Sequence, residues 1–210
     1  MMPSRAELAD FAPMAERAVS AEAATLIRLR TVTVAPGRDA GIIAGFVRLP
    51  YEVLAGRSIV ASVDEDCDFT YSAADFLRWL DPDGEPHAVL PARRDAQWLS
   101  GLPPRSGWQR IEAVPDRAIR EVVRSGALLA RDMTSRSEQQ ALLDSIVLTV
   151  SAGGQRVDVP LGPLSALTRM GFLPRGSEAV IDTAPGWIRI AAAYGSTYVT
   201  KANPLGLLSL

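Results

Sequence analysis

The chain has 210 residues, of which 48% are hydrophobic, and a formal net charge of −2. This length is enough to bury a core, and the small net charge gives no general attraction to nucleic acid or to an anionic membrane. The chain has one histidine (His87), one cysteine (Cys67) and one lysine (Lys201). It therefore cannot supply a zinc site built from Cys and His, or a lysine-dependent phosphate loop. A histidine-based triad would have to use His87.

The first third of the chain predicts helices followed by an antiparallel sheet. Ser4 and Glu7 form a capping box at the start of a helix, and Pro13 suits the first turn of a second helical piece. Apolar and polar residues then alternate as expected for strands over residues 25–34, 42–49 and 58–63. Because the connections are too short for crossover helices, we expect these strands to form a meander.

A second capping signal and a Pro/Gly-rich stretch follow. Ser72 and Asp75 open a predicted helix that ends at Asp81. Residues 82–107 contain a short helical candidate at 92–99 and otherwise predict a long connection. We therefore expect three segments, which also fit a single domain: a helix-plus-sheet region at 1–81, the connection at 82–107, and a second region at 108–210.

The second region predicts more helix than strand. A short strand at 108–114 is followed by an amphipathic helix that starts at Pro115, and by further helices at 137–144 and 163–170. Residues 146–159 fit either a hairpin or a helix that ends at Gly153. A hairpin over 178–193 and an extended piece at 194–201 follow. The predicted fold is α+β, with a small antiparallel sheet and helices in the N-terminal half and a helical C-terminal half that contains a β-hairpin.

The acidic segment at 64–68 is the strongest candidate for catalysis. Asp64, Asp66 and Asp68 alternate after a predicted strand, so a carboxylate-based, metal-dependent hydrolase with bound Mg²⁺ or Ca²⁺ is one alternative. The segment lacks the glycine that a calcium loop needs at its sixth position, where Phe69 stands. The favoured interpretation is a solvated acidic loop, in which neighbouring carboxylates make Cys67 a poor nucleophile.

The element order of residues 115–201 resembles a winged helix. Two helices, a short extended piece, a short helix ending at Met170-Gly171 and a hairpin follow in that order. The resemblance implies a nucleic-acid-binding regulator, and its basic face would consist of Arg156, Arg169, Arg175 and Arg189. The short helix offers few side chains that read bases, so nucleic acid is the less favoured partner.

The last nine residues carry four leucines and no charge. Leu205, Leu207, Leu208 and Leu210 would be costly to leave in water, which predicts an interaction surface. These leucines would pack either on their own domain or in a groove of another subunit, which would give a homo-oligomer.

These observations together favour a protein that works through contacts rather than catalysis. No convergent catalytic set stands out, so we expect a non-catalytic protein-interaction, scaffolding or regulatory module with no cofactor. We expect its partner to be a protein or a second copy. The sequence shows neither a signal peptide nor a membrane-spanning run, which predicts a soluble cytoplasmic protein, and its preference for Arg over Lys indicates a GC-rich bacterial genome.

Overall fold

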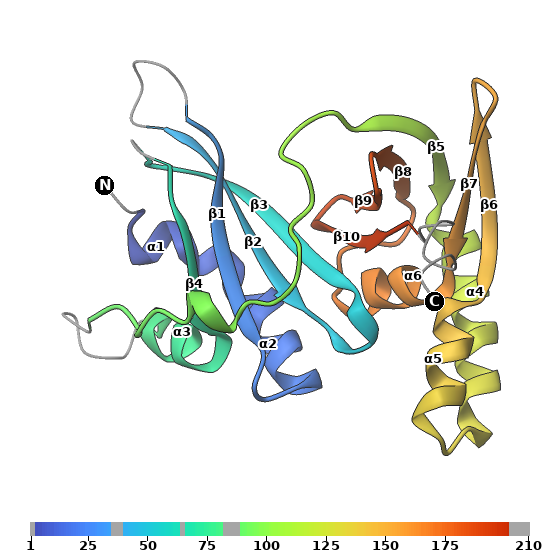
Figure 1. Ribbon diagram of the computed structural model, residues 1–210, viewed down its shortest axis with the longest axis horizontal. Helices are drawn as coiled ribbons and strands as arrows, with labels where there is room; N and C mark the ends of the chain where they lie inside the picture. The colour runs from blue at the N-terminus through green and yellow to red at the C-terminus, as the bar shows by residue number, and fades with distance from the viewer. Residues whose placement is uncertain (1–2, 35–39, 64–65, 82–88, 202–210) are drawn as a thin grey trace, which may run out of the picture. The chain divides into compact units, whose positions relative to one another are not determined.

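A computed structural model describes residues 3–34, 40–63, 66–81 and 89–201 (Figure 1). The chain divides into two compact units, Met1–Leu102 (unit 1) and Pro103–Leu210 (unit 2). Each unit carries a four-stranded antiparallel sheet with helices packed against it, so the fold is a sheet-rich α+β fold.

The sheet of unit 1 is a three-stranded meander with a fourth strand added to its first strand. Strands β1 (Leu26–Val34), β2 (Gly41–Arg48) and β3 (Leu54–Ala61) pair in sequence, and β4 (Asp68–Ser72) pairs with β1, which gives the order β4-β1-β2-β3. Along β1, buried and half-buried residues alternate, as in a strand with one face on the core.

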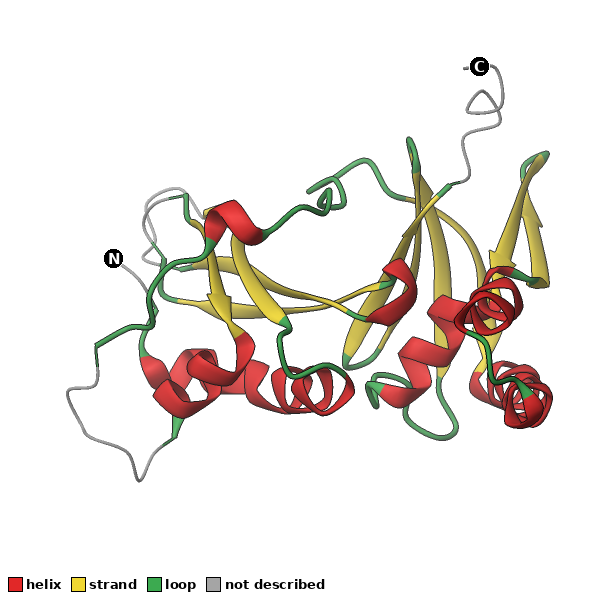
Figure 2. Cartoon of the chain, turned by 60° about the horizontal axis from the view of Figure 1, so that its bottom comes forward, coloured by secondary structure: helices red, strands yellow, loops and turns green. Residues whose placement is uncertain are grey.

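The helices of unit 1 cover one face of this sheet (Figure 2). Helix α1 (Arg5–Leu8) continues through a 3₁₀ turn (Ala9–Phe11) into α2 (Ala12–Ala21), and α3 (Ala73–Leu80) packs beside α2. The predicted caps are present: Ser4 and Glu7 complete a capping box, and Ser72 accepts a hydrogen bond from the backbone of Asp75. The core contains the fully buried side chains Phe11, Met14, Ile27, Leu29, Ile43 and Phe76.

The sheet of unit 2 is built in the same way from distant segments. Strands β8 (Glu178–Ala184), β9 (Trp187–Ala192) and β10 (Gly195–Thr200) form a meander, and β5 (Gln109–Pro115) pairs with β8, which gives the order β5-β8-β9-β10. Gly186, with a φ of 74°, makes the turn between β8 and β9.

Three helices and a separate two-stranded ribbon complete unit 2. Helices α4 (Asp116–Leu129), α5 (Arg136–Asp144) and α6 (Leu161–Arg169) pack together, and α6 also contacts β9 and β10. The ribbon consists of β6 (Ile146–Ala152) and β7 (Gln155–Pro160), joined through Gly153 and Gly154, which both have positive φ. Residues 146–159 therefore form the hairpin that was one of the two predicted alternatives.

The two units share a layout that is not visible as a repeat in the sequence. In both, a helix precedes a three-stranded meander: α2 before β1-β2-β3, and α6 before β8-β9-β10. In both, a further strand pairs with the first meander strand and is followed by a helix that packs on the first helix: β4 and α3, or β5 and α4. Unit 2 also contains α5 and the ribbon between α4 and α6.

The predicted fold class, a small antiparallel sheet followed by a helical C-terminal half, was wrong, because the chain is sheet-rich in both units. A helical region with one winged-helix-like hairpin was expected, but unit 2 has a four-stranded sheet and a ribbon. The decisive pairing joins β5 to β8, whose first residues, Gln109 and Glu178, are far apart in the chain, and local periodicity carries no information about such partners. The helix predicted at 92–99 was also wrong, because that segment contains only a 3₁₀ turn (Asp95–Gln97).

Candidate functional site

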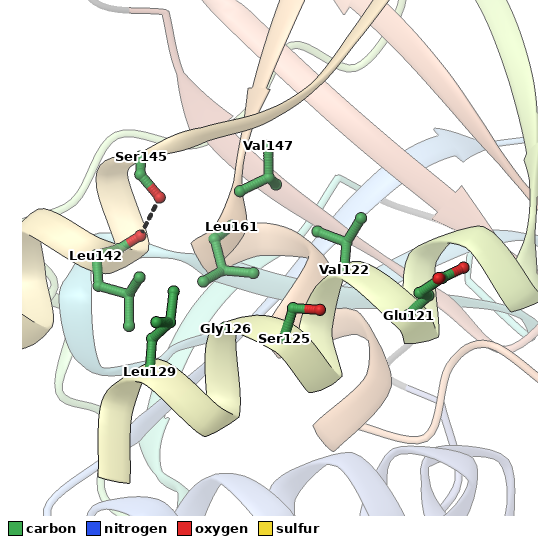
Figure 3. A pocket seen from close by; sticks show the side chains of 9 residues that line it. All are labelled: Glu121, Val122, Ser125, Gly126, Leu129, Leu142, Ser145, Val147 and Leu161. Atoms are coloured by element: carbon green, nitrogen blue, oxygen red, sulfur yellow. Dashed lines mark hydrogen bonds between the residues drawn. The ribbon is translucent and has the colours of Figure 1, made fainter. Parts of the chain in front are cut away.

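Unit 2 contains an apolar groove of about 440 Å³ between α4, the end of α5, the start of β6 and the start of α6 (Figure 3). Five apolar side chains line it, and Glu121 is the charged member of the lining. The full set is Glu121, Val122, Ser125, Gly126, Leu129, Leu142, Ser145, Val147 and Leu161. The groove is thus suited to apolar groups rather than to ions.

The floor of the groove depends on close packing between α4 and α6. A Cβ atom on Gly126 would lie 2.4 Å from Cδ2 of Leu161, so only glycine allows the helix to approach this side chain without a shift. Leu161 is 2% exposed. Its backbone N–H donates to the carbonyl oxygen of Ser145 at 3.0 Å, which ties the end of α5 to the start of α6.

One side chain of the groove lining is largely exposed. Leu129 lines the groove and is 62% exposed. Its chain neighbour Leu128 and the first residue of β6, Ile146, are 52% and 53% exposed but are not part of the lining. An exposed leucine at a concave apolar site is a feature of surfaces that bind other groups.

The opposite face of the unit 2 sheet carries a cation–aromatic cluster. Thr197 on β10 hydrogen-bonds the backbone of α6, and its cross-strand partner is Ile190, so these residues face the helix. The next residue along β9, Arg189, therefore points to the other face. There its guanidinium pairs with Asp182 at 2.7 Å and lies 4.4 Å from the centre of the Trp108 ring.

Unit 1 has a similar cluster on its own sheet. Arg28 on β1 donates two hydrogen bonds to Asp68 on β4, at 2.5 and 2.9 Å, and lies 5.9 Å from the centre of the Trp98 ring. The bond to Asp68 raises the pKa of Arg28. In each unit, a tryptophan from the segment between α3 and β5 thus covers an arginine that is paired with an aspartate on a neighbouring strand.

Each unit matches a family model. Residues 1–100 match a family model described as domain of unknown function DUF8010, and residues 103–204 match one described as domain of unknown function DUF8185. No curated protein matches the sequence.

Several solved structures of DNA polymerase sliding clamps are similar to this chain. The DNA polymerase sliding clamp from Bacillus subtilis is 10% identical over 99% of this chain and 67% of its own, with a TM-score of 0.60. The clamp from Caulobacter crescentus is 14% identical over 95% of this chain and 65% of its own, with a TM-score of 0.56. The clamp from Pseudomonas aeruginosa, solved with a ligand, is 10% identical over 96% and 66%, with a TM-score of 0.57.

The chain has a sliding-clamp-like fold. At these identities the likeness concerns the fold alone, and the chain spans about two thirds of the length of these clamps. In the described residues, no helix is long and apolar enough to cross a membrane.

The sliding-clamp-like fold does not support the predicted metal site. Asp64 lies outside the described residues, and Asp68 is committed to Arg28. Cys67 is buried, and its Sγ lies 3.1 Å from the hydroxyl of Thr31. Within the described ranges, no three His, Cys, Asp or Glu side chains gather as metal ligands. Asp68 is the first residue of β4 and therefore belongs to the sheet.

The winged-helix interpretation was wrong, and its four arginines lie on different elements. Arg156 on β7 pairs with Asp158 at 3.1 Å, and Arg189 on β9 pairs with Asp182. Arg169 is the last residue of α6, and Arg175 follows in the loop before β8.

His87 and the four leucines of the predicted interaction surface, Leu205, Leu207, Leu208 and Leu210, lie outside the described residues. The groove itself was missed at the level of sequence. Leu128 and Leu129 are adjacent at the end of α4, so at least one of them must lie outside the buried stripe of an amphipathic helix. This exposed leucine was the signal in the sequence for an apolar surface on α4.

Proposed function

We propose that this chain is a non-catalytic scaffold that binds a short apolar peptide segment of a protein partner in the groove of unit 2. The observation that carries the proposal is the apolar groove itself, in which the lining residue Leu129 is 62% exposed. The sliding-clamp-like fold supports a scaffold because the similar structures are named as parts of DNA polymerases rather than as enzymes in their own right.

The groove has the capacity for a weak, specific contact. Its volume of about 440 Å³ accommodates a few leucine-sized side chains. Each fully buried side chain of this size contributes roughly 1.5–3 kcal/mol, and part of this gain offsets the ordering of the peptide. Two or three such anchors contribute roughly 3–9 kcal/mol before this cost, so we expect a dissociation constant that is micromolar or weaker, which suits exchange between partners.

Selection from a random peptide display library tests this proposal. We expect selected peptides to share two or three apolar anchors and to bind the purified chain in fluorescence anisotropy titrations. Leu129→Arg should weaken this binding at least about tenfold, because it places a charge in an apolar site. Leu99→Arg is the matched control, since Leu99 is 87% exposed in unit 1. Failure to select any peptide, or equal loss in both variants, would contradict the proposal.

The proposed compartment is the cytoplasm. Cys67 is a free, buried thiol, and a reducing compartment keeps such a thiol in this state.

A further inference from the structure

Strand β10 runs past α6 towards the groove. At its start, Gly195 lies against Phe172, which follows the end of α6: a Cβ on Gly195 would be 2.8 Å from the ring. Two residues later, Thr197 donates from Oγ1 to the carbonyl oxygen of Pro163, in the first turn of α6, at 3.0 Å. The strand therefore heads for the N-terminal end of α6, where Leu161 lines the groove.

The end of β10 is fixed to unit 2. The backbone N–H of Lys201 donates to the carbonyl oxygen of Gly186 at 2.8 Å. The following residues, 202–210, read Ala-Asn-Pro-Leu-Gly-Leu-Leu-Ser-Leu and carry four leucines without a charge. An apolar, uncharged segment thus begins from a fixed point on the same unit as an apolar groove.

We propose that residues 202–210 of the same chain occupy the groove. This inference rests on the proposed function, because it assigns the groove a resident apolar segment that a partner peptide must displace. The leucines of the segment meet the same lining that would receive the partner, chiefly Leu129, Leu142 and Val147. Docking removes apolar surface on both sides from water.

The lengths permit this contact. Nine extended residues span up to about 30 Å. Lys201 is four residues beyond Thr197, which adds at most about 14 Å, and Pro163 is two residues from Leu161 along a helix. The distal leucines, Leu208 and Leu210, therefore reach the groove while Lys201 keeps its hydrogen bond.

Tethering favours this occupant over a free competitor. A segment joined by a short flexible link has an effective concentration on the order of millimolar at its site. A partner peptide binds only those chains in which the groove is free, so its apparent affinity falls by the fraction of chains in that state. The segment therefore acts as an internal competitor.

Disulfide trapping tests the contact. Because the chain has one cysteine, replacing it leaves only the two introduced thiols. In a full-length Cys67→Ser background, Ser209→Cys is combined with Ser125→Cys in the groove lining. The control combines it with Ser151→Cys, an exposed position on β6 outside that lining. We expect an intramolecular disulfide in the groove pair, identified by mass spectrometry of the monomer, to form at least about tenfold faster than in the control pair, since exchange depends on access.

Equal rates in the two pairs would overturn the proposal. Predominant cross-links between two chains would overturn it as well, because the segment would then occupy a second copy. A second measurement uses the full chain with Leu207→Asp and Leu208→Asp. Amide hydrogen exchange should become faster in residues 121–129 and 142–147 and stay the same in residues 149–158 of the ribbon, and unchanged exchange at the groove would contradict docking.

The two proposals fail in different ways. If the disulfide does not form but selected peptides bind and are sensitive to Leu129→Arg, the binding function stands and the resident segment is wrong. If the disulfide forms but no peptide binds even when the two leucines are replaced, the segment contact stands and the partner is wrong.

Discussion

The Cζ atom of Arg189 lies 4.4 Å from the centre of the Trp108 ring, while the same guanidinium pairs with Asp182. Trp108 is held in turn, because its Nε1 donates to the carbonyl oxygen of Pro104 at 3.1 Å, and its ring lies 5.9 Å from that of Tyr198. The segment that enters unit 2 is therefore anchored to the outer face of its sheet before β5 begins.

Replacement of this tryptophan should destabilise unit 2. We expect Trp108→Leu to lower the free energy of unfolding by about 1–2 kcal/mol, through loss of the cation–π contact and of aromatic packing. Urea unfolding followed by circular dichroism measures the change. Leu99→Ala, at an 87% exposed position, should have almost no effect. Equal stabilities for Trp108→Leu and the wild type would show that the contact contributes nothing.

Gly45 on β2 allows the ring of Phe11 to pack against the sheet. A Cβ at this position would lie 2.9 Å from two ring atoms of Phe11, which is fully buried. We expect Gly45→Ala to cost about 1–3 kcal/mol through overpacking. Ser58→Ala, at an exposed position on the neighbouring strand, is the control. Phe11→Leu should make room, so the double variant should lose less than the sum of the single losses.

Glu7 makes stability depend on acid. Its carboxylate accepts hydrogen bonds from the side chain and backbone of Ser4 and from the backbone of Ser62, and these bonds lower its pKa to about 2. A lowered pKa of an acid contributes stability that is fully present above the unfolded value of 4.5 and is lost as the pH falls towards 2.

Thermal unfolding between pH 6 and pH 2, roughly the span over which this carboxylate titrates, measures the effect. Glu7→Gln should lower the melting temperature near neutral pH and should approach the wild type at the acidic end. Glu16→Gln, on the exposed side of α2, should follow the wild-type curve. A constant gap between Glu7→Gln and the wild type across this range would contradict the assignment.

Divalent cations should leave stability unchanged. Asp68 is engaged by Arg28 through both carboxylate oxygens, so it offers little to a cation. We expect the same melting temperature with millimolar Mg²⁺, with millimolar Ca²⁺ and with a chelator. A cation bound at a hundred times its dissociation constant would add about 2.7 kcal/mol, which a thermal shift would reveal.

Duplex DNA should bind weakly. Arg117 and Arg124 are exposed on α4, but Glu121 lies between them, and the whole chain carries a net charge of −2. We expect a dissociation constant above about 10⁻⁴ M at physiological salt in anisotropy titrations. Tighter binding that falls steeply with salt, and that Arg117→Glu with Arg124→Glu removes, would show instead that α4 contacts phosphates.

Local signals in the sequence located most helices and strands, but they did not show which strands pair with each other. The capping box at Ser4 and the cap at Ser72 are local, and each appears in the structure where the residues predict it. Strand β4 was missed because its charged first residue, Asp68, looked like part of an acidic loop, although Arg28 on the neighbouring strand compensates that charge.

The groove could not be located from the sequence, because the adjacent leucines at the end of α4 do not show which elements this helix packs against. It needs Gly126 on α4, Leu142 on α5 and Leu161 on α6 to meet, and only tertiary packing brings these helices together. The winged-helix interpretation was wrong for the opposite reason. Residues that looked related along the chain, such as Arg156 and Arg189, lie on different elements and are paired with different carboxylates.

The shared layout separates a framework that both units have from the elements that unit 2 adds to it. The groove lies where the units differ: α5 and the ribbon stand between α4 and α6 in unit 2, and the described part of unit 1 has no counterpart for them. The recess with apolar walls is thus a product of added elements rather than of an altered framework.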